Sequence, residues 1–494
     1  MEDPLARFSE ATRTWFRAAF AEPTAAQAGA WDAIARGQHT LVVAPTGSGK
    51  TLSAFLAGLD RLLTTPAPDD RLHRTRVLYV SPLKALAVDV ERNLRAPLTG
   101  IRQTAERLHP GQPFPEVSVG IRSGDTHANE RRRLATRPPD VLITTPESLF
   151  LILTSQARET LRGIETVIID EVHAVAGTKR GAHLALSLER LDALLPEPAQ
   201  RIGLSATVRP TEEVARFLGG TAPVEIVAPP THKEWDLRVE VPVEDMTELG
   251  QVVEDDDPTA PPQRASIWPH VEQRVAELIG EHRSTIVFTN GRRTAERLTA
   301  RLNEIAAEMS IEGITPPAQV MAQSGQSEGA GTVIAKAHHG SVSKEQRAVI
   351  EDDLKRGRLP CVVATSSLEL GIDMGSVDLV VQIESPPSVA SALQRVGRAG
   401  HQVGETSRGV LFPKHRGDLA QTAVAVERMR TGAIEKMAVP TNPLDVLAQQ
   451  VVAALAMEDW QVDELSALVQ RAADRKSTRL NSSHTDISRM PSSA

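Results

Sequence analysis

A glycine-rich loop near the start of the chain has the residue types that bind phosphate groups. The segment Ala44-Pro-Thr-Gly-Ser-Gly-Lys50-Thr51 follows the apolar run Leu41–Ala44 and opens a helical pattern over Leu52–Leu63. Glycines let backbone N–H groups close around phosphate oxygens at a helix N-terminus. Lys50 can add a point charge, and the Thr51 hydroxyl can bind Mg²⁺. This order of strand, loop and helix predicts a nucleotide site, although Ala44 stands where the strict pattern has glycine.

Two acidic residues follow another apolar run, at a position where they can face this loop. Asp170-Glu171-Val172-His173 comes directly after Val167-Ile-Ile. Asp170 can hold Mg²⁺ through its water shell, and Glu171 can orient the attacking water. Paired acids at a strand end are also common on protein surfaces. The glycine loop upstream favours the catalytic interpretation.

A glutamine upstream of the loop is a candidate for base selection. Gln27 ends the segment Pro23-Thr-Ala-Ala-Gln27, and its carboxamide has a donor and an acceptor that match the exposed edge of adenine. This favours ATP over GTP, although a lone glutamine is usually just a polar surface residue. The residues expected to bind ATP are Gln27, Thr46, Gly47, Ser48, Gly49, Lys50 and Thr51, with Thr51 and Asp170 as the metal ligands.

Two further segments carry groups that can act on the same phosphates. Gln394-Arg-Val-Gly-Arg398-Ala-Gly-His401 sets arginines beside glycines, and an arginine that reaches a γ-phosphate supplies roughly 10³–10⁵ in rate. Ser205-Ala-Thr207 follows an apolar run, and its hydroxyls can sense the nucleotide state. The alternatives are a solvated basic turn for the first segment and ordinary turn chemistry for the second.

Composition limits the class of protein. A chain of 494 residues is too long for one ordinary core, which predicts two or three domains. The net charge of −8 excludes a generally basic nucleic-acid binder, so any such binding must come from local grooves. The single cysteine, Cys361, lies in an apolar run and is expected to be buried, which suits a reducing cytoplasm. Met1–Phe20 lacks the apolar core of a signal peptide, and no run is long enough to span a bilayer.

Short apolar strands alternate with helical patterns in both halves of the chain, which predicts an α/β fold of two parallel sheets covered by helices. The expected strands include Leu41–Ala44, Val77–Val80, Val117–Ile121, Val141–Thr144, Val167–Asp170, Ile202–Ser205, Thr285–Phe288, Cys361–Ala364, Leu379–Ile383 and Gly409–Phe412. We expect domains at 1–250 and 267–434, an acidic, proline-rich linker at 251–266, the truncated start of a helical, winged-helix-like domain at 435–475, and a disordered, non-native tail at 476–494.

The order of these segments resembles the motifs of superfamily 2 helicases of the DEAD/DEAH type. The correspondence is Ala44–Thr51 with motif I, Ser81–Leu86 with Ia, Thr144–Ser148 with Ib, Asp170–His173 with II, Ser205–Thr207 with III, Ile286–Asn290 with IV, Val363–Asp373 with V and Gln394–His401 with VI. Asp-Glu-Val-His, Ile121–Thr126 and Ala337–Ser341 are more narrowly similar to the helicase core of the large helicase-related (Lhr) family of bacterial DNA repair helicases.

The resemblance implies two tandem RecA-like domains with ATP and Mg²⁺ between them. It gives Arg398 the role of an arginine finger, with Arg395 and Gln394 nearby, while His401 stands where many relatives have a second arginine. It gives a nucleic-acid groove to Lys84, Arg122, Thr145 and Thr365, mainly for phosphate and sugar contacts. Coupling between the sites falls to His173, Ser205, Thr207 and Asp373.

The implied function is ATP-driven movement along single-stranded DNA, 3′ to 5′, by a bacterial cytoplasmic, nucleoid-associated repair helicase. An RNA or DNA–RNA hybrid helicase remains open, because groove motifs read the backbone. A truncated ATPase or binding module that grips strands without unwinding them also remains open. A metabolic kinase is disfavoured because it has no use for a matching second domain.

Overall fold

The computed structural model describes residues 3–45, 47–112, 114–230, 233–247, 252–253, 263–264, 266–311, 333–369, 375–400 and 405–472. Thr46, Asp373 and His401 lie outside these ranges, as do the expected tail at 476–494 and most of the expected linker. Within the described residues, the structure has no helix with both the length and the apolar character needed to cross a bilayer.

The first lobe is built on a seven-stranded parallel sheet in the order β3-β4-β2-β5-β6-β1-β7. The strands are β1 (His39–Val43), β2 (Val77–Val80), β3 (Val119–Arg122), β4 (Val141–Thr144), β5 (Thr166–Ile169), β6 (Gln200–Ser205) and β7 (Val224–Val227). The helices are α1 (Glu10–Ala19), α2 (Ala25–Ala35), α3 (Lys50–Thr64), α4 (Lys84–Leu108), α5 (Ala128–Thr136), α6 (Pro146–Leu153), α7 (Val172–Ala176), α8 (Lys179–Leu194) and α9 (Thr211–Gly219).

The second lobe has a six-stranded parallel sheet in the order β12-β13-β11-β14-β15-β8. Its strands are β8 (Trp235–Val239), β11 (Thr285–Phe288), β12 (Ala335–His338), β13 (Cys361–Ala364), β14 (Leu379–Ile383) and β15 (Ser407–Phe412). Its helices are α10 (Trp268–Glu281), α11 (Arg292–Ile311), α13 (Lys344–Lys355), α14 (Val389–Val396) and α15 (Arg416–Thr431). Two short strands, β9 (Val252–Val253) and β10 (Gln263–Arg264), pair with each other in antiparallel fashion.

The central strands are buried because helices cover both faces of each sheet, as the continuous apolar runs predict. Every residue of β2, β4, β5, β11, β13 and β14 is buried. Cys361 is fully buried, as predicted, and burial raises the pKa of its thiol. The predicted α/β class with two RecA-like sheets is therefore confirmed.

The second lobe begins earlier than the sequence suggested. Trp235–Val239 pairs in parallel with β15, with Leu237 opposite Gly409, so it is an edge strand of the second sheet. The chain therefore crosses between the lobes before residue 235 rather than at the expected boundary at 250. Apolar and charged residues alternate along this edge strand, so it has no continuous apolar run. The boundary was therefore predicted at the acidic, proline-rich stretch further along the chain.

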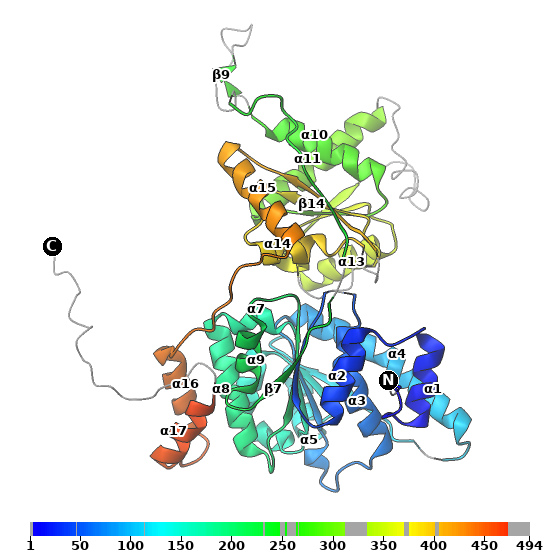
Figure 1. Cartoon of the computed structure of the whole chain (residues 1–494), viewed down its shortest axis with the longest axis vertical. Helices are drawn as coiled ribbons and strands as arrows, with labels where there is room; N and C mark the ends of the chain where they lie inside the picture. Colours follow the sequence, from blue (N-terminus) through cyan, green and yellow to red (C-terminus); the bar gives the residue numbers. More distant parts are fainter. Residues whose placement is uncertain are drawn as a thin grey trace, which may run out of the picture.

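The last two described helices return to the first lobe. After α15 the chain runs back along the molecule, and α16 (Leu444–Leu455) and α17 (Val462–Arg471) lie beside α8 (Figure 1). Val446, Leu468 and Val469 are buried in the core of lobe 1. The segment that follows α15 is thus attached to the first lobe, although more than two hundred residues separate the two in the chain.

Candidate active site

The glycine loop forms a tight connection between β1 and α3. Gly47 and Gly49 have φ of 84° and 76°, a region that favours glycine. A Cβ on Gly49 would also lie 2.5 Å from the Gln27 amide nitrogen. Lys50, the first residue of α3, donates from Nζ to the Ala44 carbonyl at 2.6 Å and to the Ser205 carbonyl at 3.3 Å. Two residues of the loop therefore have a backbone conformation that favours glycine, and the lysine that follows is directed at the ends of β1 and β6.

Gln27 lies against this loop at the start of α2. Its Oε1 accepts from the Thr24 backbone N–H at 3.0 Å, and its Nε2 donates to the Gly49 carbonyl at 3.4 Å. Thr24 donates from its hydroxyl to the Ser48 carbonyl at 3.0 Å. Thr24 and Gln27 also form the capping box at the start of α2. The hydrogen bonds of these two residues therefore connect α2 to the phosphate loop.

Asp170 and Glu171 lie at the end of β5, beside the loop. Asp170 is buried, and both of its oxygens are held: Tyr79 donates its hydroxyl to Oδ2, and the Glu171 N–H donates to Oδ1 at 2.8 Å. Glu171 has φ of 43°, a left-handed conformation that is strained for a residue with a side chain. Such strain gathers at functional sites, where the surrounding structure enforces it.

The charges of the site are coupled. Burial, followed by the neighbouring charge of Glu171, raises the pKa of Asp170 to about 7. Burial would also raise the pKa of Glu171, but the charges of His173, Lys50 and Arg398 together lower it. Burial lowers the pKa of Lys50, while the two carboxylates oppose that shift. Two acids and one lysine therefore share a desolvated space.

His173 connects three of the predicted motifs. The Ala206 N–H donates to its Nδ1 at 3.2 Å, and the Ser205 hydroxyl lies 3.2 Å from the same atom. Its Nε2 lies 2.7 Å from the Gln394 carboxamide of the second lobe. The Gln394 atom at this distance is its amide nitrogen, so the hydrogen-bond roles of the two groups depend on the imidazole tautomer. Burial lowers the pKa of His173, which favours a neutral imidazole.

The two arginines of the second lobe differ in their surroundings. Arg395 is buried within its own lobe, where it pairs with Glu369 at 3.0 Å and donates to Asn290 at 3.1 Å and Gln382 at 2.9 Å. Arg398 donates to the Glu369 carbonyl at 2.8 Å, and its charge lowers the pKa of both Lys50 and Glu171. Only Arg398, of the two, is electrostatically coupled to the acid pair across the lobes.

The remaining site residues of the first lobe lie at the edges of this arrangement. Thr51 is in the first turn of α3, directly after Lys50. Ser48 donates its hydroxyl to the Pro45 carbonyl at 2.7 Å. Thr207 is exposed beyond the end of β6.

A cavity of about 830 Å³ lies between the lobes and brings together three of the four predicted groove residues. Lys84, Thr145 and Thr365 line it. Arg122 is not among the lining residues; it is the last residue of β3, and its carbonyl accepts from the Thr144 hydroxyl at 2.8 Å. This cavity, called the groove below, is bounded by both lobes.

Sequence reasoning missed several groups that the fold brings to these sites. Tyr79 is the only tyrosine of the chain, and it lies in an apolar run. A buried phenol hydroxyl needs a hydrogen-bond partner, so the sequence did contain a signal for this residue. The basic side chains of the groove gave no local signal, because they come from helices far apart in the sequence. They are Arg92, Arg180, Arg292, Lys344 and Arg347.

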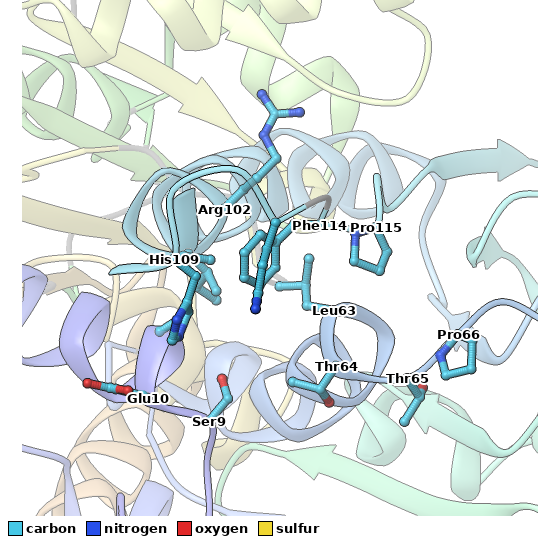
Figure 2. A pocket seen from close by; sticks show the side chains of 14 residues that line it. Ser9, Glu10, Leu63, Thr64, Thr65, Pro66, Arg102, His109, Phe114 and Pro115 are labelled. Carbon is cyan, nitrogen blue, oxygen red and sulfur yellow. The ribbon is translucent and has the colours of Figure 1, made fainter. Parts of the chain in front are cut away.

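A second cavity, of about 430 Å³, lies away from the acid pair, where α1, the end of α3 and α4 meet (Figure 2). Leu63, His109 and Phe114 are among the residues around it, and the centroids of the His109 and Phe114 rings lie 6.4 Å apart with an angle of 29° between the ring planes. None of the predicted site residues lines this cavity.

Comparisons with known proteins place this geometry in a family. Three family models match consecutive parts of the chain: DEAD/DEAH box helicase at 24–216, helicase conserved C-terminal domain at 271–402, and large helicase-related protein, winged helix domain at 427–478. The Lhr helicase/probable uracil glycosylase of Mycolicibacterium smegmatis is 64% identical over 481 residues, which covers 95% of this chain and 31% of that protein. The Lhr helicase/uracil glycosylase of Escherichia coli is 56% identical, with the same coverage of 95% and 31%.

A solved structure agrees with the sequence matches. The structure of Mycobacterium smegmatis helicase Lhr bound to ssDNA and AMP-PNP superposes with a TM-score of 0.83 at 63% identity, covering 96% of this chain and 56% of that one. The fold, the acid pair and the family matches define the chain as a superfamily 2 helicase core of the DEAD/DEAH type, a class of ATP-hydrolysing enzymes. Within that class it resembles the helicase core of the large helicase-related (Lhr) family. The chain spans about a third of the length of the two curated relatives described above.

Proposed function

We propose that this chain is an ATP-driven motor that moves along single-stranded DNA. The observation that carries the proposal is the contact between the lobes at the acid pair, where Gln394 approaches His173 at 2.7 Å and Arg398 acts on Lys50 and Glu171. A site completed by both lobes responds to their relative position. The related M. smegmatis Lhr has been captured with ssDNA and AMP-PNP, which supports both ligands.

The residues of the first lobe fit a nucleotide with a divalent cation. The buried Asp170 and the half-buried Glu171 lie near one lysine, and burial, followed by the charge of Glu171, raises the pKa of Asp170, so a bound cation would stabilise its ionised form. Asp170 and the Thr51 hydroxyl would hold Mg²⁺, whose chemistry is to neutralise charge on the phosphate oxygens. Lys50 would exchange its carbonyl partners for phosphate oxygens, and Glu171 would orient the attacking water.

Movement follows from a shared ligand. Lys50 and Arg398 bind the same phosphates from opposite lobes, so ATP holds the lobes together and hydrolysis removes that link. The contact between His173 and Gln394 also joins the two lobes, so it would change when hydrolysis changes their relative position. If each lobe grips the strand with different strength in each state, the cycle becomes directional stepping. The family resemblance supports 3′ to 5′ direction and a role in DNA repair.

The groove supports a backbone-tracking mode of binding. Lys84 and Thr145 come from the first lobe and Thr365 from the second, so one strand would contact both. In the structure Lys84 pairs with Asp125, and Arg180 pairs with Glu147, so a phosphate would compete with a carboxylate for each cation. Such contacts do not distinguish DNA from RNA, and an RNA or hybrid helicase is the second candidate.

The test is ATP turnover with single-stranded DNA, with single-stranded RNA and with neither. We expect stimulation by DNA, loss of turnover in Lys50→Ala, and strand affinity that weakens as salt rises. Lys84→Ala should lower the slope of log affinity against log salt by roughly one. Retained turnover in purified Lys50→Ala would contradict the site. Stimulation by RNA alone would favour the second candidate.

A further inference from the structure

The chain between α15 and α16 changes lobes within a few residues. Ile434 is buried in the core of the second lobe, whereas Val439 is buried in the core of the first. Residues 435–439, called the strap below, form this crossing. It is a second covalent connection between the lobes, separate from the crossing before β8.

On the second lobe, the strap holds the start of α14. Glu435 accepts from the Val389 N–H at 2.7 Å with Oε1 and from the Ala390 N–H at 3.2 Å with Oε2. These N–H groups lie in the first turn of the helix, where a carboxylate is favourable. Burial would raise the pKa of Glu435, but these backbone donors lower it overall, so the group binds as a carboxylate.

Helix α14 carries the groups that face the first lobe. Gln394 lies in its last turn, and Arg398 follows its end. The helix is short, running from Val389 to Val396, so a shift at its first turn is transmitted to its last. Holding its start therefore sets the position of the Gln394 carboxamide and the Arg398 guanidinium.

On the first lobe, the strap lies beside the segments that follow the acid pair and Ser205–Thr207. The Met437 N–H donates to the Arg209 carbonyl at 2.7 Å, and the Val439 N–H donates to Glu213 Oε1 at 3.2 Å. Gly177, which directly follows α7, faces the strap: a Cβ there would lie 3.6 Å from the Ala438 carbonyl oxygen and from the Met437 side chain. One five-residue segment thus contacts elements that carry the catalytic groups of both lobes.

The helices after the strap are fixed to the first lobe by buried polar contacts. Gln450 is 2% exposed; it donates to the His183 carbonyl and the Ser187 hydroxyl and accepts from Arg190 at 2.9 Å. Arg471 pairs with Glu189 at 3.0 Å. A fully partnered buried network is rigid, so α16 and α17 move with lobe 1 and hold one end of the strap still.

We propose that Glu435 is a positioning residue for ATP hydrolysis, through which the strap ties α14 to the first lobe and sets the alignment of Arg398 and Gln394 with the acid pair. This inference rests on the proposed ATP hydrolysis. It predicts a loss in the chemical step rather than in nucleotide binding, because the ATP-binding loop itself lies in the first lobe. It also predicts that the position of the third segment affects turnover without touching the nucleotide.

The experiment measures kcat and KM for ATP with single-stranded DNA present in Glu435→Gln, which keeps the size of the side chain and removes its charge. We expect kcat to fall roughly tenfold, because small misalignments of catalytic groups are costly, with KM changed less than about twofold. Glu435→Asp should recover part of the loss. The matched control is Asp445→Asn. Asp445 is an exposed acid in α16 that pairs with Lys179, and this variant should hydrolyse ATP at the wild-type rate.

A second variant tests the other end of the strap. Glu213→Gln weakens the acceptor of the Val439 N–H while α14 keeps its cap, so kcat should fall with KM preserved, and the double variant should be no worse than the sum of the singles predicts. If Glu435→Gln does not fold, the kcat of Glu213→Gln alone tests the inference. Wild-type kcat in folded Glu435→Gln or, failing that, in folded Glu213→Gln overturns the inference while the proposed function stands. A wild-type chain without turnover contradicts both.

Discussion

The two lobes contribute to the active site in different ways. The first lobe presents its groups already assembled: Lys50, Asp170 and Glu171 lie close enough to shift one another's pKa values, and Tyr79 donates a hydrogen bond to the Asp170 carboxylate. The second lobe presents one arginine near that space and keeps the other in its own interior. Binding is therefore built into one lobe, and the completion of the catalytic site depends on where the other lobe lies.

Because of this difference, we expect substitutions in the two lobes to change nucleotide affinity and the rate of ATP turnover separately. Changes in the first lobe's loop should weaken nucleotide binding, whereas changes at the end of α14 should act on turnover. The interior arginine should act on neither directly, because its partners Glu369, Asn290 and Gln382 belong to the second lobe. Its role is to hold the segments that carry Arg398 in place. The four substitutions below test this division, beginning with the largest expected effect.

Glu171→Gln should give the largest effect, in the first lobe. The amide can still lie against the site but cannot accept a proton from water, so hydrolysis should slow by roughly 10²–10⁴-fold. Nucleotide affinity should be kept, since Lys50 and the loop are unchanged. Single-turnover hydrolysis and nucleotide titration measure the two separately. A loss of affinity as large as the loss of rate would mean that Glu171 acts in binding.

Arg398→Ala should slow turnover by roughly 10²–10³-fold, because one preorganised donor to the developing charge is removed. The nucleotide should bind almost as well as in the wild type, since the first lobe holds most of its contacts. Steady-state kinetics with nucleotide titration measure this. Equal losses in rate and affinity would remove the distinction between the lobes.

Arg395→Ala should destabilise the second lobe by about 3 kcal/mol, because it leaves the buried carboxylate of Glu369 without its cation. Chemical denaturation measures this, and Arg398→Ala in parallel is the control. If the Arg395 variant is as stable as the wild type but inactive, then Arg395 acts on the phosphates directly.

Lys233 lies where the chain crosses between the lobes, and its substitution should have the smallest effect on stability. It donates to the Gly397 carbonyl at 3.3 Å, and burial, with the charge of Arg398, lowers its pKa from 10.5 to about 8 despite the opposing charge of Glu405. Between these two pH values the unfolded chain binds the proton that the folded chain has lost. The wild type should therefore gain stability relative to Lys233→Met as the pH rises through this window.

Denaturation of both proteins at several pH values checks this prediction, with Lys179→Met, at an exposed lysine, as the control. The effect should stay below about 1 kcal/mol because the Lys233 side chain is partly exposed to solvent. A stability difference between wild type and Lys233→Met that is independent of pH would contradict the assigned burial.

Much of the fold was predictable because buried parallel strands leave continuous apolar runs. Val77–Val80 and Cys361–Ala364 are strands where those runs predicted them. The edge strand Trp235–Val239 was missed because apolar and charged residues alternate along it, so it has no continuous apolar run. Of the predicted groove residues, Lys84 and Thr365 line one cavity, whereas Arg122 does not. Its position at a strand end did not determine the direction of its side chain.

The sequence alone determined that there are two α/β lobes and that one has a phosphate loop and an acid pair, because these depend on local backbone conformation and burial. Only the tertiary structure decided which arginine acts across the lobes, and that α16 and α17 return to lobe 1. Gln394 and His173 are 221 residues apart in the chain, and Glu435 caps a helix 46 residues earlier. Pairings of that range leave no local pattern, because they arise only when whole sheets and helices pack together.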